Sequence, residues 1–301
     1  MAYKRISPQP VEEGGTGAST ITGVLTGNGT SAVTANAVTQ YAVLVGGASN
    51  AVGNVASVGT SGQVLTSNGA GSNPTFQDIP TSAINQVVIQ TFTSNGTYTP
   101  TSGMVYCIIE CVGGGGGGGG SSTSSSSQAS IGGGGASGVY ARKLSDSATV
   151  GASQSVTIGA GGAGGTVGGG NGSAGGTTSL GSICSANGGN GGNGTAATTN
   201  FVIANGGSST ATGTGDLVVP SRSGFFGIGS ISGTIVAGGI GGPSFYSGSP
   251  QSVVGSGDGP GNAAPNYGGG GGGAATAPSN FQRAGGDGSD GIVIVTEFIS
   301  T

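Results

Sequence analysis

Residues that could carry out acid–base chemistry are few and scattered in this sequence. It has no histidine, no tryptophan, three cysteines, and ten acidic and six basic residues among 301. Carboxylates such as Glu110, Asp146 and Asp216 stand far apart, so the paired carboxylates of a sugar-cleaving site would have to be assembled between chains. Such sites also need aromatic platforms, and only 5% of the residues are aromatic. We therefore expect no catalytic residues and keep a polysaccharide-degrading enzyme as an alternative.

One stretch matches a calcium-binding repeat. Residues 285 to 293 read Gly-Gly-Asp-Gly-Ser-Asp-Gly-Ile-Val, which agrees with the nonapeptide G-G-x-G-x-D-x-U-x at every fixed position. That site needs stacked tandem turns to surround the ion, and one copy does not supply them. An acidic turn before the last strand is the competing interpretation. We predict no metal and no cofactor, and keep Asp287 and Asp290 as calcium candidates.

The three cysteines have neither the spacing of a metal site nor the even number of a disulfide framework. Alternation along the strand pattern from residue 105 puts Val105, Cys107, Ile109 and Cys111 on one face. We predict that these cysteines and Cys184 are small buried hydrophobic residues. Free thiols fit assembly in a reducing cytoplasm.

Large aromatic and arginine side chains occur at a few positions in the glycine-rich half of the chain. Aromatic residues and arginine dominate the binding energy of interfaces. For any single one, the competing interpretation is that it fills a gap beside the glycine backbone, but we expect at least one pair to face outward. The candidate binding residues are Arg222, Phe225, Phe226, Phe245, Tyr246, Tyr267, Phe281 and Arg283.

Glycine dominates the segments that must position these side chains. The chain has 73 glycines, with unbroken runs at Gly113 to Gly120 and Gly268 to Gly273. Ordering each glycine costs roughly 0.5 to 1 kcal/mol more than ordering alanine, so the backbone must recover this cost through hydrogen bonds. Polyglycine in a left-handed three-residue helix rises about 3.1 Å per residue, and such helices can bond laterally because no side chain intervenes. We predict polyglycine II-type helices.

The segments between the glycine runs have ordinary composition, and we expect them to be loops displayed at the ends of the helix bundle. They are Ser121 to Ser130, Ala196 to Ala204, Asp216 to Ser232, Pro243 to Val254, Pro260 to Tyr267 and Ala274 to Arg283.

A loose repeat occupies the first part of the chain. Similar stretches start at Val24, Val43 and Val64, each with a glycine turn and a following strand of small residues. Units of about 20 residues cannot bury a core alone and need stacking or partner chains. We predict a β-repeat shaft and attachment region over residues 1–85, with a plain β meander as the alternative.

Aliphatic strand patterns frame the remainder, residues 86–301. They cover residues 86–112, 138–158 and 291–299, and leave glycine-rich loops and helices at 113–137 and 159–290. The last strand is apolar on nearly both faces, which is typical of a central strand. The predicted fold is all-β: a fibrous shaft followed by a small β-sandwich that carries a long glycine-rich excursion.

Charge and hydropathy exclude two kinds of partner. The formal net charge is −4 with no basic patch, so we expect no nucleic acid. We find neither a secretory signal nor an apolar stretch long enough to span a bilayer, and predict no membrane insertion.

Two sets of motifs resemble known proteins. Gly14-Gly15-Thr16-Gly17-Ala18-Ser19-Thr20 is similar to the repeats of phage tail-fibre shafts. Residues 91–100, the strand that ends at Val112 with its glycine run, residues 140–143 and residues 291–296 look like the glycine-rich domain of phage fibre and bacterial surface proteins. Together these stretches cover most of the chain.

The resemblance implies a homotrimeric fibre whose tip binds a host receptor, either a glycan or an outer-membrane protein. The N-terminal region would join other fibre or baseplate proteins. The location would be the virion, acting outside the cell, or alternatively a bacterial surface. We therefore predict a non-enzymatic tail fibre or adhesin. A self-assembling structural filament subunit and a tailspike-like enzyme are the alternatives.

Overall fold

The computed structural model is built almost entirely of strands. In the described residues the single helix is α1 (Ser147–Val150), so the predicted all-β class is confirmed. The chain divides into two compact units, Met1–Thr81 and Ser82–Thr301. The structure describes residues 23–28, 31–47, 51–79, 84–230, 235–250 and 258–300.

Unit 1 is a series of antiparallel strand pairs, and the two strands predicted for each repeat are confirmed. Residues 29–30 and 48–50, between the strands of the first two pairs, lie outside the described residues. In its described part Val55 is the only buried hydrophobic residue, whereas Leu25, Leu44 and Leu65 are exposed. The hairpins therefore have no shared core within one chain. The paired strands are β1 (Val24–Asn28) with β2 (Ser31–Asn36), β3 (Leu44–Gly46) with β4 (Val52–Asn54), and β5 (Gln63–Thr66) with β6 (Thr75–Asp78).

Unit 2 begins with a sandwich of two five-stranded antiparallel sheets. The first sheet has the order β17-β11-β9-β21-β7 and the second β16-β14-β13-β12-β8. The C-terminal strand β21 lies between β9 and β7, a central position, as its apolar faces predicted. The strands of the first sheet are β7 (Gln86–Phe92), β9 (Met104–Val112), β11 (Tyr140–Asp146), β17 (Leu217–Val219) and β21 (Ile292–Ile299). Those of the second are β8 (Gly96–Tyr98), β12 (Gln154–Thr157), β13 (Thr178–Leu180), β14 (Cys184–Ala186) and β16 (Gly213–Thr214).

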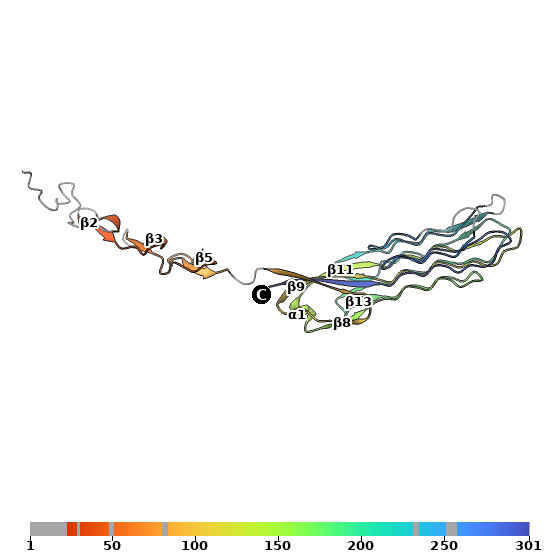
Figure 1. Cartoon of the computed structure of the whole chain (residues 1–301), viewed down its shortest axis with the longest axis horizontal. Coiled ribbons are helices and arrows are strands. Elements are labelled where there is room, and N and C mark those ends of the chain that lie inside the picture. Colours follow the sequence, from red (N-terminus) through yellow and green to blue (C-terminus); the bar gives the residue numbers. More distant parts are fainter. Residues whose placement is uncertain are drawn as a thin grey trace, which may run out of the picture. The chain divides into compact units, whose positions relative to one another are not determined.

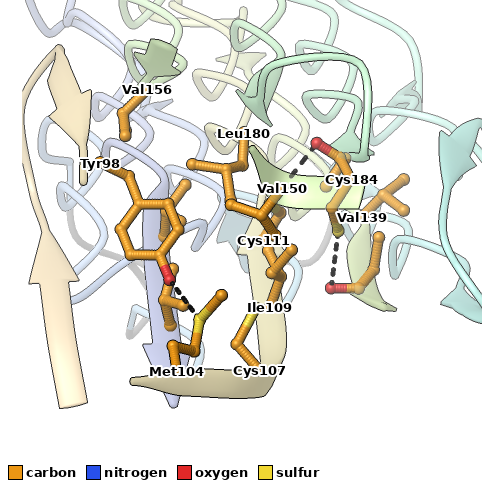
Figure 2. Close-up of a cluster of buried hydrophobic side chains, with 14 residues drawn as sticks. Tyr98, Met104, Cys107, Ile109, Cys111, Val139, Val150, Val156, Leu180 and Cys184 are labelled. Carbon is orange, nitrogen blue, oxygen red and sulfur yellow. Dashed lines mark hydrogen bonds between the residues drawn. The ribbon is translucent and has the colours of Figure 1, made fainter. Parts of the chain in front are cut away.

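The sandwich core contains all three cysteines. Cys107, Cys111 and Cys184 are free and fully buried in the cluster that contains Ile109, as predicted. Figure 2 shows Cys111 near Leu180 and Val150, and Cys107 at the opposite end of the cluster near Met104. Burial raises the pKa of the Cys107 thiol to about 11, so it stays protonated and unreactive near neutral pH.

Val105 does not share the buried face predicted for it. The register between β9 and β21 pairs Tyr106 with Phe298 and then Met104 with Ile299, which leaves Val105 as the extra residue of a bulge. The bulge breaks the alternation, so Met104 is buried and Val105 is exposed.

The glycine run after β9 forms the centre of a hydrogen-bonded lattice. The amides of Gly113–Gly120 donate in turn to three antiparallel segments, residues 133–139, 170–176 and 286–289. Carbonyls of the same run accept from parallel segments at 162–165, 189–192 and 271–274. Each neighbour is met again at every third residue, which is the period of polyglycine II. The hydrogen bonds are therefore those that the predicted polyglycine II-type helices require.

Residues 132–139 form a second central run, with the same kind of environment. Their amides donate to segments 268–274, 187–193 and 222–225. A methyl group on Gly116 would overlap the carbonyl oxygen of Asn190, and one on Gly135 would overlap that of Gly116. Glycine is therefore needed because the backbones approach more closely than any side chain allows.

We call this array the glycine lattice. Figure 1 shows its segments running side by side, away from the sandwich strands β11 and β13; we call the opposite end of the lattice the distal end. There β15 (Val202–Ala204), β18 (Gly227–Ser230) and β19 (Ile235–Ala237) form a sheet, and β10 (Ser130–Ile131) pairs with β20 (Ala275–Thr276). A small core that includes Ala129, Ile131, Ala204 and Val236 fills this end.

Two of the predicted loop segments lie within the ordered array instead. The described part of residues 216–232, which ends at Ser230, supplies β17, a lattice segment and β18. Residues 260–267 supply lattice residues bonded to 284–287. These segments lie at the periphery of the lattice, where side chains can point to solvent, so their ordinary composition does not prevent lattice pairing. Ser121–Ser130 and Ala274–Arg283 do contain distal loops.

Candidate binding surface at the distal end

The outer side of the distal sheet is apolar. Val202, Ala204 and Val236 face the small core, and a methyl on Gly229 would contact Val202, Ile131 and Ala129, so the inner side of the sheet is full. Strand alternation therefore turns the intervening residues outward. Phe201 and Phe226 directly precede β15 and β18 and continue the outward series. We call the outward set the distal face: Phe201, Ile203, Phe226, Ile228 and Ile235.

Large side chains of this face are open to solvent. Phe201 is 64% exposed and Phe226 59%, and none of the residues that define the face is charged. An exposed group of large apolar residues marks an interaction site more often than a random surface does. The arrangement can bind an apolar or aromatic partner surface through burial and ring stacking.

Phe225, next to the distal face, has a rigid backbone. Its amide donates to Ile240 O at 2.8 Å, and its carbonyl accepts from Gly134 N at 2.9 Å, inside the second central run. Its side chain is exposed. The lattice thus fixes the backbone that carries the ring and leaves the ring uncovered, which limits the backbone entropy lost on binding.

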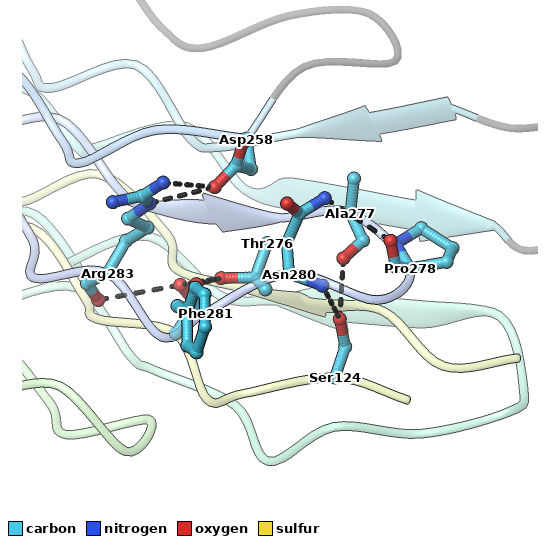
Figure 3. A network of polar contacts seen from close by, with 9 residues as sticks. Ser124, Asp258, Thr276, Ala277, Pro278, Asn280, Phe281 and Arg283 are labelled. Carbon is cyan, nitrogen blue, oxygen red and sulfur yellow. Dashed lines mark hydrogen bonds and ion pairs between the residues drawn. The ribbon is translucent and has the colours of Figure 1, made fainter. Parts of the chain in front are cut away.

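Phe281 is the most exposed phenylalanine in the described residues, at 74%. Its loop is fastened to the loop that follows the first central run, as Figure 3 shows: Ser124 Oγ donates to Ala277 O at 2.5 Å, and Asn280 N to Ser124 Oγ at 3.4 Å. Ser124 N also donates to Asn280 O at 3.1 Å. Two tied loops thus hold the exposed Phe281 ring at the distal end.

Arg283 is already paired. Its Nε and Nη2 atoms both donate to Asp258 Oδ2, at 2.8 and 2.6 Å (Figure 3). An ion pair of this partly exposed kind contributes at most about 1 kcal/mol of stability. Its main effect is to orient the guanidinium toward the protein, so Arg283 is less available for a ligand than the sequence suggested.

Phe245 and Tyr246 lie at the sandwich end of the lattice. Phe245 stacks on Tyr140 of β11, with ring centroids 4.1 Å apart. Tyr246 and Tyr140 both donate to Glu110 Oε1, at 3.1 and 2.6 Å. Burial and the nearby Glu110 carboxylate raise the pKa of Tyr246 to about 12, so it remains a hydroxyl donor. These rings therefore have partners within the sandwich.

Arg222 and Tyr267 complete the candidate set. Arg222 is exposed, and its backbone is tied to Ser137 by two hydrogen bonds of 2.9 Å. The Tyr267 carbonyl accepts from Ser244 Oγ at 2.5 Å, near the aromatic group at the sandwich end. Of the eight candidates, the structure thus places Phe226 in the distal face, Phe225 next to it, and Phe281 and Arg283 in the distal loops.

Asp287 and Asp290 complete the edge of the lattice. Asp287 Oδ1 accepts from Gly164 N and Asp290 Oδ1 from Gly161 N, both at 2.7 Å. Each carboxylate thus accepts the kind of hydrogen bond that backbone carbonyls accept elsewhere in the lattice. The two aspartates are three residues apart, which matches the three-residue period of the lattice. Within the described ranges no group of three or more His, Cys, Asp or Glu residues is placed to hold a metal ion.

This lattice and its framing strands correspond to a known family. Residues 90–297 match the family model described as a glycine-rich domain, which is more than half of the chain. The chain belongs to the glycine-rich domain family. No curated protein matches it.

The glycine-rich domain has binding candidates that the sequence did not reveal. Phe201, Ile203 and Ile235 belong to the distal face but were not singled out, because β15 and β19 are three residues long. The one available signal was the period-two spacing of Phe201 and Ile203. In the part of the chain that the structure describes, no helix is long and apolar enough to cross a membrane.

Proposed function

We propose that this protein is a non-enzymatic receptor-binding tail fibre or adhesin, which attaches a phage, or alternatively a bacterial surface, to a host cell. The observation that carries the proposal is the distal face, where large apolar side chains are exposed on a hydrogen-bonded lattice. A soluble chain has no folding reason to present phenylalanines there, because leaving them in water forgoes their burial energy. Recognition of a partner supplies that reason.

Rigidity of the support favours the same function. The amides of both central runs bond to neighbouring segments, and tied loops hold Phe281. A pre-organised surface loses little conformational entropy on binding. The receptor would be a host glycan or an outer-membrane protein, and the chain would act outside the cell as part of the virion.

Unit 1 favours a multimeric fibre. In the described part of unit 1 the hairpins expose Leu25, Leu44 and Leu65 and share no core, so partner chains would complete them. We propose a homotrimer in which unit 1 forms the shaft and joins other fibre or baseplate proteins. Three copies of a weak binding face gain avidity without any new contact.

A structural filament subunit is the second candidate. Strand β7 is an open edge of the first sheet, and its seven residues Gln86–Phe92 carry no charge. Uncharged open edges invite strand pairing between molecules. This function predicts indefinite polymers, whereas a fibre tip predicts a finite species.

Binding to intact cells tests the proposed function. Fluorescently labelled protein would be incubated with a panel of bacterial strains, with and without protease treatment or removal of surface polysaccharide. We expect saturable binding to a subset of strains, lost after one of the two treatments according to whether the receptor is protein or glycan. Binding to no strain, or equal binding to all strains and to bare plastic, would contradict the proposal. Release of oligosaccharide would instead support a tailspike-like enzyme.

A further inference from the structure

The first sheet of the sandwich has a second apolar face. One face packs on the second sheet through Cys107, Ile109 and Cys111. The register across β7, β21, β9, β11 and β17 places a second series on the opposite side, because alternate residues point to opposite faces. We call this series the outer face: Val87, Ile89, Tyr106, Ile108, Leu144, Leu217, Ile294 and Phe298.

Much of the outer face is uncovered in the single chain. Phe245 and Tyr246 cover only the end nearest the lattice, around Tyr140. Beyond them Ile89 is 64% exposed and Leu144 56%. A hollow of about 310 Å³ lies among Ile108, Arg142, Leu144, Asp216 and Leu217. A sheet that is apolar on both sides is ordinarily covered on both.

The outer face is large enough to form a protein–protein interface. Five strands about 4.8 Å apart and about seven residues long give a flat area on the order of 550 Å². Patches of about 300 to 600 Å² are the largest on typical monomers and are often functional. Side-chain relief adds accessible surface beyond the flat area, toward the roughly 800 Å² per partner of a standard interface.

Another copy of this chain is the partner that the molecule itself indicates. Unit 1 also leaves apolar hairpin residues uncovered, so both units lack cover that a neighbouring copy would supply. Only residues 80–83 lie between Ile79, the last described residue of unit 1, and Ile84. Strand β7 follows almost at once. Copies that associate through their hairpins would therefore keep their first sheets at high local concentration.

The charges of the face suit such packing. The Glu110 carboxylate is already bonded to the hydroxyls of Tyr140 and Tyr246, so a partner need not supply donors for it. Arg142 and Asp216 line the hollow near the β17 edge of the sheet. The exposed Asp146 lies opposite Tyr106 at the C-terminal end of β11. Interface centres are commonly depleted of charge, with charged groups toward the rim.

We propose that the outer face of the first sheet is the surface through which copies of this chain pack together, with three such sheets facing the axis of the homotrimer. The inference rests on the homotrimer of the proposed function and names its contact surface. The ring stack of Tyr106 on Phe298, with centroids 4.5 Å apart, would lie in this contact.

Light scattering of the full chain after size exclusion tests the inference. The wild-type protein should have a mass near three times 27.8 kDa. The double variant Ile89→Lys/Leu144→Lys should have the mass of a single chain and an unchanged circular dichroism spectrum. Val167→Lys, also at an exposed valine, is the matched control and should stay trimeric. A trimeric double variant would overturn the assignment of the face but not the trimer. Monomeric wild type would overturn the homotrimer itself.

Thiol labelling covers the case in which the lysine variant does not fold. The native cysteines are buried, so a single introduced thiol is read selectively. Leu144→Cys should react with a maleimide at least tenfold more slowly than Val167→Cys in the trimer. Equal labelling rates would overturn the proposal, and so would slow labelling of Leu144→Cys in a monomer, since the chain's own residues would then cover the face.

Discussion

The Tyr98 hydroxyl donates a 2.7 Å hydrogen bond to the carboxylate of Glu297, which is fully buried in the sandwich. Thr101 donates twice more, from its amide at 3.0 Å and its hydroxyl at 2.5 Å, and Gln90 Nε2 donates at 3.2 Å. All of these donors are neutral. Burial alone would raise the pKa of Glu297, but the hydrogen bonds, led by Thr101 and Tyr98, outweigh it and lower that pKa below its ordinary value.

Acid should therefore weaken the sandwich through Glu297. Because its folded-state pKa is lowered, the carboxylate contributes stability that is present above its unfolded pKa of about 4.3 and is lost as the pH falls through the folded value. Urea unfolding at pH 7 and at pH 3.5 measures this loss. Glu297→Gln should be less stable than wild type by about 2 kcal/mol at pH 7, with a smaller difference at pH 3.5. An equal difference at both pH values would contradict the account.

Glycine in a central run should not tolerate even one methyl group. Gly116→Ala would overlap the Asn190 carbonyl, so we expect a loss of about 3 kcal/mol or more. Gly96→Ala is the matched control: nothing lies within 4 Å of the added atom, and stability should change by no more than about 1 kcal/mol. Thermal unfolding of both variants gives the comparison. Similar melting temperatures would show that close backbone packing does not limit the lattice.

Asp287 and Asp290 should stabilise the lattice without calcium. Asp287→Ala removes the acceptor of the Gly164 amide and should cost about 1 kcal/mol, whereas Asp287→Asn retains an acceptor oxygen and should cost less. Melting curves with calcium and with a chelator should coincide. A calcium-dependent rise of several degrees, absent in Asp290→Ala, would instead establish a metal site.

The aromatic group at the sandwich end should matter for stability and not for cell binding. Phe245→Ala removes the stack on Tyr140, which is worth about 1 kcal/mol. Chemical unfolding and cell binding of the same preparation separate the two roles. A variant with normal stability and lost binding would move the receptor site from the distal end to the sandwich end.

The sequence predicted the framing strands well because their apolar residues alternate over many positions. The strand predicted to end at Val112, within residues 86–112, is β9 (Met104–Val112), and the central place of Ile292–Ile299 followed from its two apolar faces. The bulge at Val105 was not predictable, because it depends on the partner strand. The sandwich also uses Thr178–Leu180 and Cys184–Ala186, from a region assigned to loops and helices. Strands of three residues are too short to show a period.

The candidate site was predictable only in part. Phe225, Phe226 and Phe281 stand out as large residues among small ones, and all three are exposed. The pairing of Arg283 with Asp258 joins distant segments and leaves no sequence signal. The distal face depends on three strands from separate parts of the chain, so its members become neighbours only in the folded lattice.

The most direct test of the account is the affinity of distal-face variants for a bacterial strain that the wild-type protein binds. Phe201→Ser/Phe226→Ser, which changes only exposed rings, should keep the wild-type mass and melting temperature and bind cells at least tenfold more weakly, while Phe245→Ser binds as wild type does. Undiminished binding of the folded double variant would contradict the claim that the distal face recognises the receptor.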